Sequence, residues 1–167
     1  MQLIAKIGMA LFSLVFVFSL CQAGTSDDEI RSRADRGDSI AQYNLGLMCA
    51  KGQGEPQDYA EAIKWFKKAA EQGQVNGQYS LGVMYERGRG VAQDYTEAIK
   101  WYKKAAEQGH AEAQNNIGVM YAKGQGVLQD NGEAMKWFKK AADQEEANSQ
   151  YNLQVMYKRG RAVAQRR

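Results

Sequence analysis

An internal repeat of 36 residues constrains the fold of this chain more than any other feature. Residues 40–75 and 76–111 are identical at 22 of 36 positions. Periods of 20–50 residues are typical of repeat arrays, so each recurring residue indicates a packing or backbone requirement repeated in space. The clearest columns are Gln42, Gln78, Gln114 and Gln150; Met48, Met84, Met120 and Met156; Trp65, Trp101 and Trp137; and Gly52, Gly88, Gly124 and Gly160.

The first half of each unit predicts a helix. Within residues 40–51, apolar side chains recur at helical spacing, and two glycines then break the pattern at Gly52 and Gly54. The apolar stripe in the first copy is Ala41, Leu45, Met48 and Cys49.

The second half predicts another helix, which begins at Asp58. Glu61 follows three residues later, and this spacing is typical of a capping box in which each side chain bonds a free backbone N–H. Gly73 is the expected left-handed residue after the helix end. The predicted buried stripe is Ala62, Trp65, Phe66, Ala69 and Ala70, so the tryptophan column is interpreted as core rather than as a sugar-stacking site.

Three glycines, Gly46, Gly82 and Gly118, recur in the middle of the predicted first helices. Glycine in a helix interior costs about 1 kcal/mol relative to alanine. Because the cost recurs in three copies, we expect it to be offset by close helix approach, with a large aromatic side chain of a neighbouring helix filling the space.

No stretch alternates as a strand would, so the predicted fold is all-α, with about eight helices. A two-helix hairpin cannot bury both its faces alone, and stacked neighbours would bury a continuous core. The expected organisation is a signal peptide at 1–23, an N-terminal half-repeat helix at 24–39, repeats at 40–75, 76–111 and 112–146, a partial repeat at 147–160, and a disordered basic tail at 161–167.

The N-terminus predicts export. Residues 7–20 carry no charge, which suits the apolar core of a secretory signal but falls short of the ~20 residues that span a bilayer. Cys21 and Ala23 place small residues before a cut after Ala23. We expect a periplasmic or secreted protein with no stable membrane insertion after cleavage. Two alternatives are an uncleaved anchor and a lipoprotein modified at Cys21, which Leu20 fits poorly.

The amino-acid composition excludes several classes of protein. The chain is 44% hydrophobic with one proline, which excludes a disordered or proline-rich protein. Its 22 basic and 19 acidic residues leave a net charge of +3, which gives no reason to expect nucleic acid as a partner. After cleavage Cys49 is the only thiol, and because it stands in a column of tyrosines we expect it to be buried.

The run AQYNLGLMCAKGQGEPQDYAEAIKWFKKAAEQG, with copies from Gln78 and Gln114, closely resembles the Sel-1-like repeat, a relative of the tetratricopeptide repeat. The resemblance covers about Ile40 to Gly160. It implies an α-solenoid of antiparallel hairpins wound into a right-handed superhelix, and a role as an adaptor for macromolecular complexes. Known themes of the family are secreted bacterial proteins that meet host cells, periplasmic regulators of envelope signalling and eukaryotic quality-control adaptors.

The fourth copy departs from the pattern. Gln154 replaces the helix glycine, Ala162 replaces the second turn glycine and Glu145 replaces the glycine after the preceding helix. The array therefore ends on a first helix without its partner. We expect this end to be frayed or covered by self-association, since solenoid ends normally need a polar cap.

Candidates for chemistry are few, and we predict no catalytic residue, metal site or cofactor. His110 is the only histidine, and a metal site needs several converging ligands, so it is interpreted as a surface residue at a helix start. The Gly52-Gln53-Gly54 turn lacks the strand and third glycine of a dinucleotide site. The recurring lysines of the second helices, beginning with Lys64, are interpreted as a solvated face with acidic partners, the alternative being attraction to an anionic envelope polymer.

Function is therefore expected on the face lined by the first helices, as a groove that binds a protein or peptide. Tyrosine and asparagine make adaptable contact surfaces. The alternative is the penicillin-binding or β-lactamase-like activity described for a cysteine-rich branch of the same family, but the cysteine pair in each repeat of that branch is absent here. The predicted binding residues are Tyr43, Asn44, Leu47, Tyr79, Ser80, Val83, Asn115, Asn116, Val119, Tyr151, Asn152 and Val155.

Overall fold

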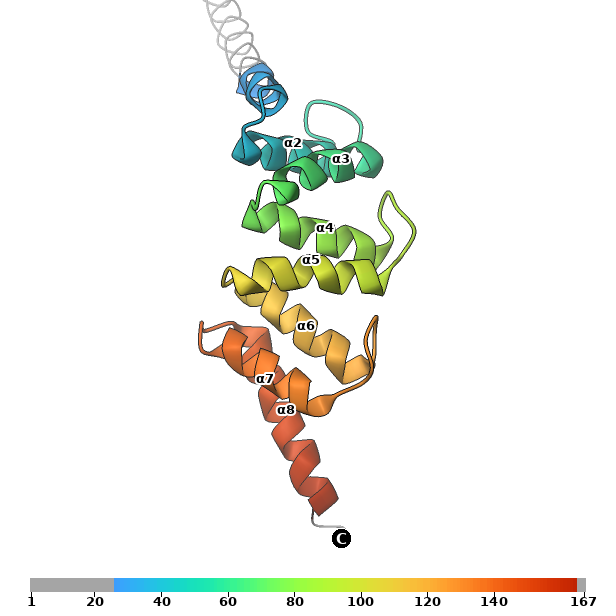
Figure 1. Ribbon diagram of the computed structural model, residues 1–167, viewed down its shortest axis with the longest axis vertical. Helices are drawn as coiled ribbons and strands as arrows, with labels where there is room; N and C mark the ends of the chain where they lie inside the picture. The colour runs from blue at the N-terminus through green and yellow to red at the C-terminus, as the bar shows by residue number, and fades with distance from the viewer. Residues whose placement is uncertain (1–25, 165–167) are drawn as a thin grey trace, which may run out of the picture.

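The computed structural model describes residues 26–164, with the side chains of residues 26–158. The predicted signal peptide at 1–23 lies outside this range, as do residues 165–167 of the predicted tail. Over the described residues the chain is helical and contains no strand, which confirms the all-α prediction (Figure 1). A helix at residues 26–35 is followed by α2 (Ser39–Lys51), α3 (Tyr59–Glu71), α4 (Val75–Arg87), α5 (Tyr95–Glu107), α6 (Ala111–Lys123), α7 (Asn131–Ala142) and α8 (Ala147–Ala164).

The helices pack in chain order. α2 pairs with α3, α4 with α5 and α6 with α7, and each of these hairpins contacts the next helix along the chain. The hairpins therefore stack one after another along the long axis of the molecule, as a solenoid does (Figure 1). None of the helices between residues 26 and 164 is long and apolar enough to cross a membrane.

The second helices begin at capped aspartates. Asp58 Oδ1 accepts hydrogen bonds from the N–H groups of Ala60 and Glu61, at 2.9 and 3.0 Å, and Asp94 and Asp130 repeat the arrangement. The reciprocal half of the predicted capping box is wrong, because the Glu61 carboxylate instead accepts from Lys64 Nζ at 2.8 Å. A flexible ammonium one turn away competes successfully for that carboxylate at the surface.

Recurring glycines close the helices with left-handed backbone. Gly52, Gly88 and Gly124 follow α2, α4 and α6 with φ of 70°, 62° and 69°. The residue that follows the second helix also has left-handed backbone, as at Gly73, where φ is 84°. In the last copy Glu145 occupies this position, with φ of 64°. A residue with a Cβ is disfavoured there by about 1–2 kcal/mol, so the chain still turns where the repeat demands, at a cost.

The mid-helix glycines lie directly against aromatic rings. A Cβ added to Gly46 would come within 2.6 Å of the Phe66 ring, and one added to Gly82 within 2.6 Å of the Tyr102 ring. Gly118 has the same relation to Phe138 in the third hairpin. The prediction is confirmed: each glycine lowers the propensity of its helix but lets that helix approach an aromatic side chain closely. The aromatic side chain comes from the second helix of the same hairpin.

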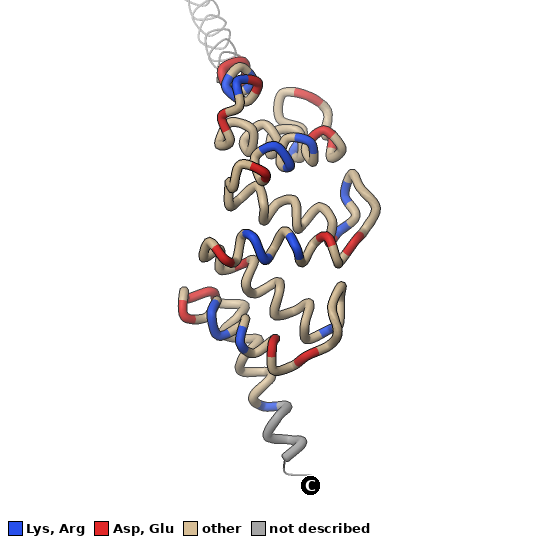
Figure 2. The backbone as a smooth tube through the Cα atoms, in the orientation of Figure 1, with Lys and Arg blue, Asp and Glu red and all other residues tan. Residues whose placement is uncertain are grey.

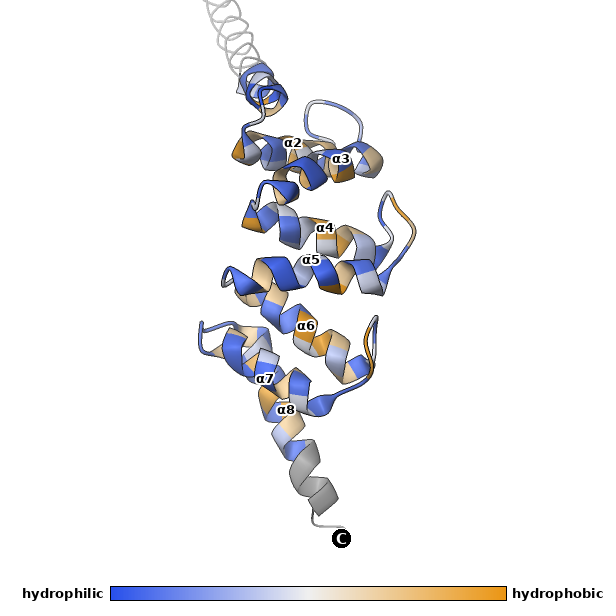
Figure 3. Cartoon of the chain, viewed as in Figure 1, coloured by the Kyte–Doolittle hydropathy of each residue, from blue (hydrophilic) through white to orange (hydrophobic). Residues whose placement is uncertain are grey.

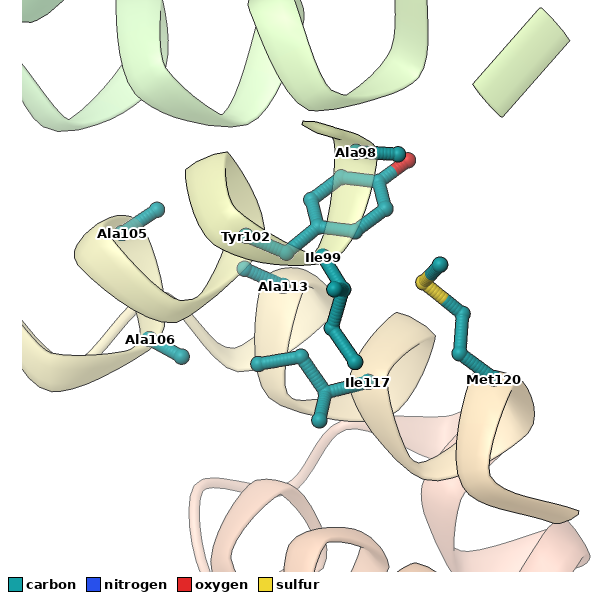
Figure 4. Packing of buried hydrophobic residues seen from close by; sticks show 8 residues of the cluster. All are labelled: Ala98, Ile99, Tyr102, Ala105, Ala106, Ala113, Ile117 and Met120. Carbon is teal, nitrogen blue, oxygen red and sulfur yellow. The ribbon is translucent and has the colours of Figure 1, made fainter. Parts of the chain in front are cut away.

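The core runs continuously from one hairpin to the next. Its largest cluster combines α5 and α6, and half-buried side chains of the adjacent helices α4 and α7, such as Tyr85 and Trp137, pack against it. Figure 4 shows Tyr102 among the alanines of α5, with Ile117 and Met120 of α6 beside them. Tyr102 has no exposed surface, and its hydroxyl donates to Glu86 Oε2 at 2.5 Å. Hydrophobic and hydrophilic residues alternate along each helix in Figure 3, as expected for helices that bury one side.

A buried glutamine links each hairpin to its neighbour. Gln78 is 5% exposed; its Nε2 donates to the carbonyl oxygen of Ala70 at 3.2 Å, and its Oε1 accepts from Gln108 Nε2 at 2.8 Å. Gln42 and Gln114 make the equivalent pairs of hydrogen bonds. The glutamine column thus satisfies polar groups inside the helix stack, as buried polar groups require.

The last helix departs from the predicted end of the array. α8 runs to Ala164, past the point in the repeat at which α2, α4 and α6 end, because the second turn glycine is replaced by Ala162, which favours helix over a left-handed turn. Ser149, in the first turn of this helix, is fully buried. Tyr151 and Tyr157 are 66% and 53% exposed, as expected for a first helix that lacks its partner.

Candidate protein-binding face

The first helices bring the predicted binding residues into register. We call the twelve residues predicted above the first-helix face; they lie on α2, α4, α6 and α8, one set per hairpin. Tyr43 packs on Phe66 with the rings tilted by 38° and their centroids 5.9 Å apart, and Tyr79 repeats this on Tyr102 at 5.8 Å. Each tyrosine is therefore half-buried, held by its own hairpin with part of its surface free.

Side chains of successive first helices meet across the hairpin boundaries. Burial raises the pKa of the Tyr43 hydroxyl, and a hydrogen bond with Ser80 acts in the opposite direction. Burial likewise raises the pKa of Tyr79, opposed by a hydrogen bond with Asn116. Both hydroxyls stay neutral at physiological pH, so the face presents hydrogen-bonding groups without charge.

Asn115 is not available as predicted. Only 8% of it is exposed, and its Oδ1 accepts hydrogen bonds from Ser149 Oγ and from Asn152 Nδ2, both at 3.0 Å. The residue stands in the column of Tyr43 and Tyr79, but its short amide lies under α8 instead of projecting. Asn116 and Val119 on α6 stay half-buried like their equivalents on α2 and α4, so the face is closed on α6 at one position only.

His110 has a different place from the one predicted. It is the N-cap of α6, where Nδ1 accepts from the N–H of Ala113 at 3.3 Å, and its ring stacks on Tyr79 with centroids 4.4 Å apart. Burial lowers its pKa, and the charge of Glu112 acts in the opposite direction. The sequence indicated the helix start correctly, but the stacking makes His110 a half-buried support for Tyr79 rather than a surface residue.

The lysines of the second helices are largely engaged by neighbours. Lys64 lies 2.8 Å from Glu61, and Lys100 and Lys136 make the same pairing. Lys68 Nζ lies 3.8 Å above the centroid of the Trp65 ring, an arrangement repeated in the next two hairpins. The tryptophans are half-buried and pack on the neighbouring core with one side covered by lysine. Figure 2 shows the acidic residues interspersed with the basic ones, as the interpretation of a solvated face requires.

Cys49 is half-buried rather than fully buried as predicted, and Tyr85 and Tyr121 of the same column are half-buried too, so the column lies at the edge of the core. Burial, and then the charge of Glu61, raise the pKa of the Cys49 thiol. Within residues 26–164, no three side chains of histidine, cysteine, aspartate or glutamate are grouped so as to hold a metal ion.

The family model described as Sel1 repeat matches the chain three times in succession, at residues 39–74, 75–110 and 111–146. These matches correspond to the three hairpins α2–α3, α4–α5 and α6–α7. No curated protein matches the chain.

Solved structures share both the fold and the sequence. The crystal structure of c5321, a protective antigen present in uropathogenic Escherichia coli strains, has a TM-score of 0.79 and 45% identity over 80% of this chain. The chain spans only 28% of the c5321 chain. A Sel1 repeat protein from Oxalobacter formigenes has a TM-score of 0.70 and 41% identity, covering 76% of this chain and 96% of its own.

A third structure, Helicobacter pylori cysteine rich protein B, shares the fold with a TM-score of 0.58. Its identity is 23%, over 74% of this chain and 93% of that one. At this identity the likeness concerns the arrangement of helices alone.

Proposed function

The chain belongs to the Sel1 repeat family, and on that premise we propose that it is a scaffold that binds a protein or peptide partner on its first-helix face. The observation that carries the proposal is the row of half-buried tyrosines supported from behind. Tyr43 and Tyr79 are held by aromatic contacts with Phe66 and Tyr102, so little conformational entropy is lost when a partner covers them.

The chemistry of this face suits a neutral, partly apolar partner. Leu47 and Val83 lie half-buried beside the tyrosines, while Asn44 and Ser80 supply amide and hydroxyl groups. Aromatic side chains with such neighbours are typical of binding hot spots. A peptide backbone lying along α2 and α4 would find alternating apolar and hydrogen-bonding contacts, without a charge to neutralise.

Replacing Tyr43, Tyr79 and Tyr151 together by alanine is expected to abolish partner capture from the exported fraction, because each removes a large contact. Far-ultraviolet dichroism should remain helical. The control is Tyr157→Ala, which removes an exposed ring on α8 in another column and should leave capture unchanged.

A charge provides a test that leaves the tyrosine rings themselves unaltered, although Ser80 gives up its hydrogen bond with Tyr43. Ser80→Arg places a guanidinium on the same face and should also prevent capture. Undiminished capture by both the triple variant and Ser80→Arg would place the partner elsewhere.

We propose that the protein acts outside the cytoplasm, in the periplasm or after secretion, and that it has no catalytic activity. The uncharged stretch at residues 7–20 followed by Ala23 supports export. The expected intact mass of the exported protein is that of a chain beginning at Gly24. A mass that includes residues 1–23 would show a retained N-terminal segment, and a mass increased by acyl chains on Cys21 would show a lipoprotein.

A further inference from the structure

A cavity lies beside Cys49 in the first hairpin. Its volume is about 300 Å³. It is formed where the end of α2, the turn after it and the start of α3 meet the helix at 26–35. The lining residues are Arg31, Met48, Cys49, Gln53, Glu55, Pro56, Gln57, Asp58 and Glu61.

The repeat shows what this position holds elsewhere. One and two repeat lengths after Cys49 stand Tyr85 and Tyr121. Tyr85 packs half-buried against the core of its own hairpin and that of the preceding one, and Cys49 packs against the corresponding pair of clusters. The first hairpin therefore has a short thiol side chain where the second and third hairpins have a phenol ring.

One of these rings, that of Tyr121, has a cation beside it, and the first hairpin has a cation at the same register. Lys103 Nζ lies 5.8 Å from the centroid of the Tyr121 ring. Arg31 stands two repeat lengths before Lys103 and lines the cavity. A cation at this distance from an aromatic face attracts it. The Cys49 cavity thus has the space that a tyrosine ring would fill, and Arg31 stands where a cation would lie over such a ring.

The charges around the cavity indicate which ring it accepts. Three carboxylates line it, those of Glu55, Asp58 and Glu61, against one guanidinium, and Arg31 already pairs with Glu55 at 2.8 Å. An anionic ligand is therefore disfavoured. A neutral ring with a hydroxyl can donate to a carboxylate while its apolar part contacts Met48 and Pro56.

We propose that this cavity, the Cys49 pocket, binds one monocyclic phenol ring in the position that tyrosine occupies in the other hairpins. The volume is sufficient, since an apolar cavity of roughly 150 Å³ holds benzene. The site is distinct from the first-helix face. The ring can come from a free phenol or from a tyrosine side chain of a bound chain, because both carry the same phenol group.

The test is titration of the purified protein with p-cresol, the side-chain analogue of tyrosine, followed by calorimetry and by the NMR shift of the Met48 methyl group. Cys49→Tyr fills the pocket with the repeat's own ring and should weaken p-cresol binding at least ~10-fold, by occupying the site. Cys49→Phe should do the same. Tyr85→Cys opens the equivalent space in the second hairpin and should raise the stoichiometry from one to two.

Two further ligands test whether the pocket prefers a neutral ring and whether the ring comes from a free phenol or from a tyrosine side chain. p-Hydroxybenzoate should bind more weakly than p-cresol. N-acetyltyrosinamide binding with the same dependence on residue 49 would assign the pocket to a tyrosine side chain, and p-cresol binding without it would assign it to free phenols. Equal p-cresol affinity of the original protein and both Cys49 variants, or the absence of saturable binding to the original protein, would overturn the proposal.

Discussion

Gly82→Ala is expected to lower the free energy of unfolding by about 2 kcal/mol, although alanine is the better helix former. The added Cβ would lie 2.6 Å from two carbons of the Tyr102 ring. That ring cannot easily move, because Tyr102 is completely buried and its hydroxyl is bonded to Glu86. Urea denaturation followed by dichroism measures the difference.

The matched control is Gly132→Ala, the same substitution in the first turn of α7. The nearest atom to a Cβ there is Asp130 Oδ1 at 3.2 Å, and Ala60 and Thr96 already carry a Cβ at the equivalent positions beside the same kind of cap. Helix propensity then dominates, so the variant should be unchanged or up to ~1 kcal/mol more stable. If the two substitutions shifted stability in the same direction by the same amount, ring contact would not be the reason for the mid-helix glycine column.

Requirements that recur in every copy could be predicted from the sequence. Helical spacing gave the pairs of helices, and the unfavourable glycines Gly46, Gly82 and Gly118 indicated a neighbouring ring, because a cost repeated three times needs a repeated gain. The left-handed turns at Gly52 and its equivalents follow in the same way. Each of these is a contact within one hairpin, between residues close in the chain.

Features found in a single copy could not be predicted. The stacking of His110 on Tyr79, the burial of Asn115 beneath α8 and the cavity beside Cys49 each depend on a substitution in one unit and on a neighbour from another helix. A column of aligned residues describes an average unit and gives no geometry for its exceptions. The candidate site is made largely of such exceptions, so its outline was predictable but its accessible part was not.

The glutamine column is intermediate between recurring and single-copy features, because its 36-residue period was visible in the sequence but its hydrogen-bond partners were not. Gln42 accepts from Gln72, which lies 30 residues further along the chain at the far end of the next helix. A long polar side chain on a helix is most often exposed. Only the stacking of hairpins shows that this one faces the interior, where one of its hydrogen bonds reaches the preceding helix and the other stays within its own hairpin.

Replacing Gln42, Gln78 and Gln114 together by methionine is expected to unfold the protein or bring it close to unfolding. Methionine keeps the length of the side chain but removes one donor and one acceptor at each site, and each hydrogen bond contributes about 1 kcal/mol. The three sites share no hydrogen-bond partner. Their effects should add to about 6 kcal/mol, within the 5–15 kcal/mol total stability typical of a domain.

Gln150→Met is the control from the same column, because Gln150 is exposed on α8 rather than buried between helices. Its midpoint of urea denaturation should be unchanged, whereas each buried single variant should lose about 2 kcal/mol. If the buried variants were as stable as Gln150→Met, apolar packing alone would hold neighbouring hairpins together. A loss confined to the buried column would mean that these amides fix how one hairpin sits on the next, and with it the spacing at which Tyr43 and Tyr79 meet a partner.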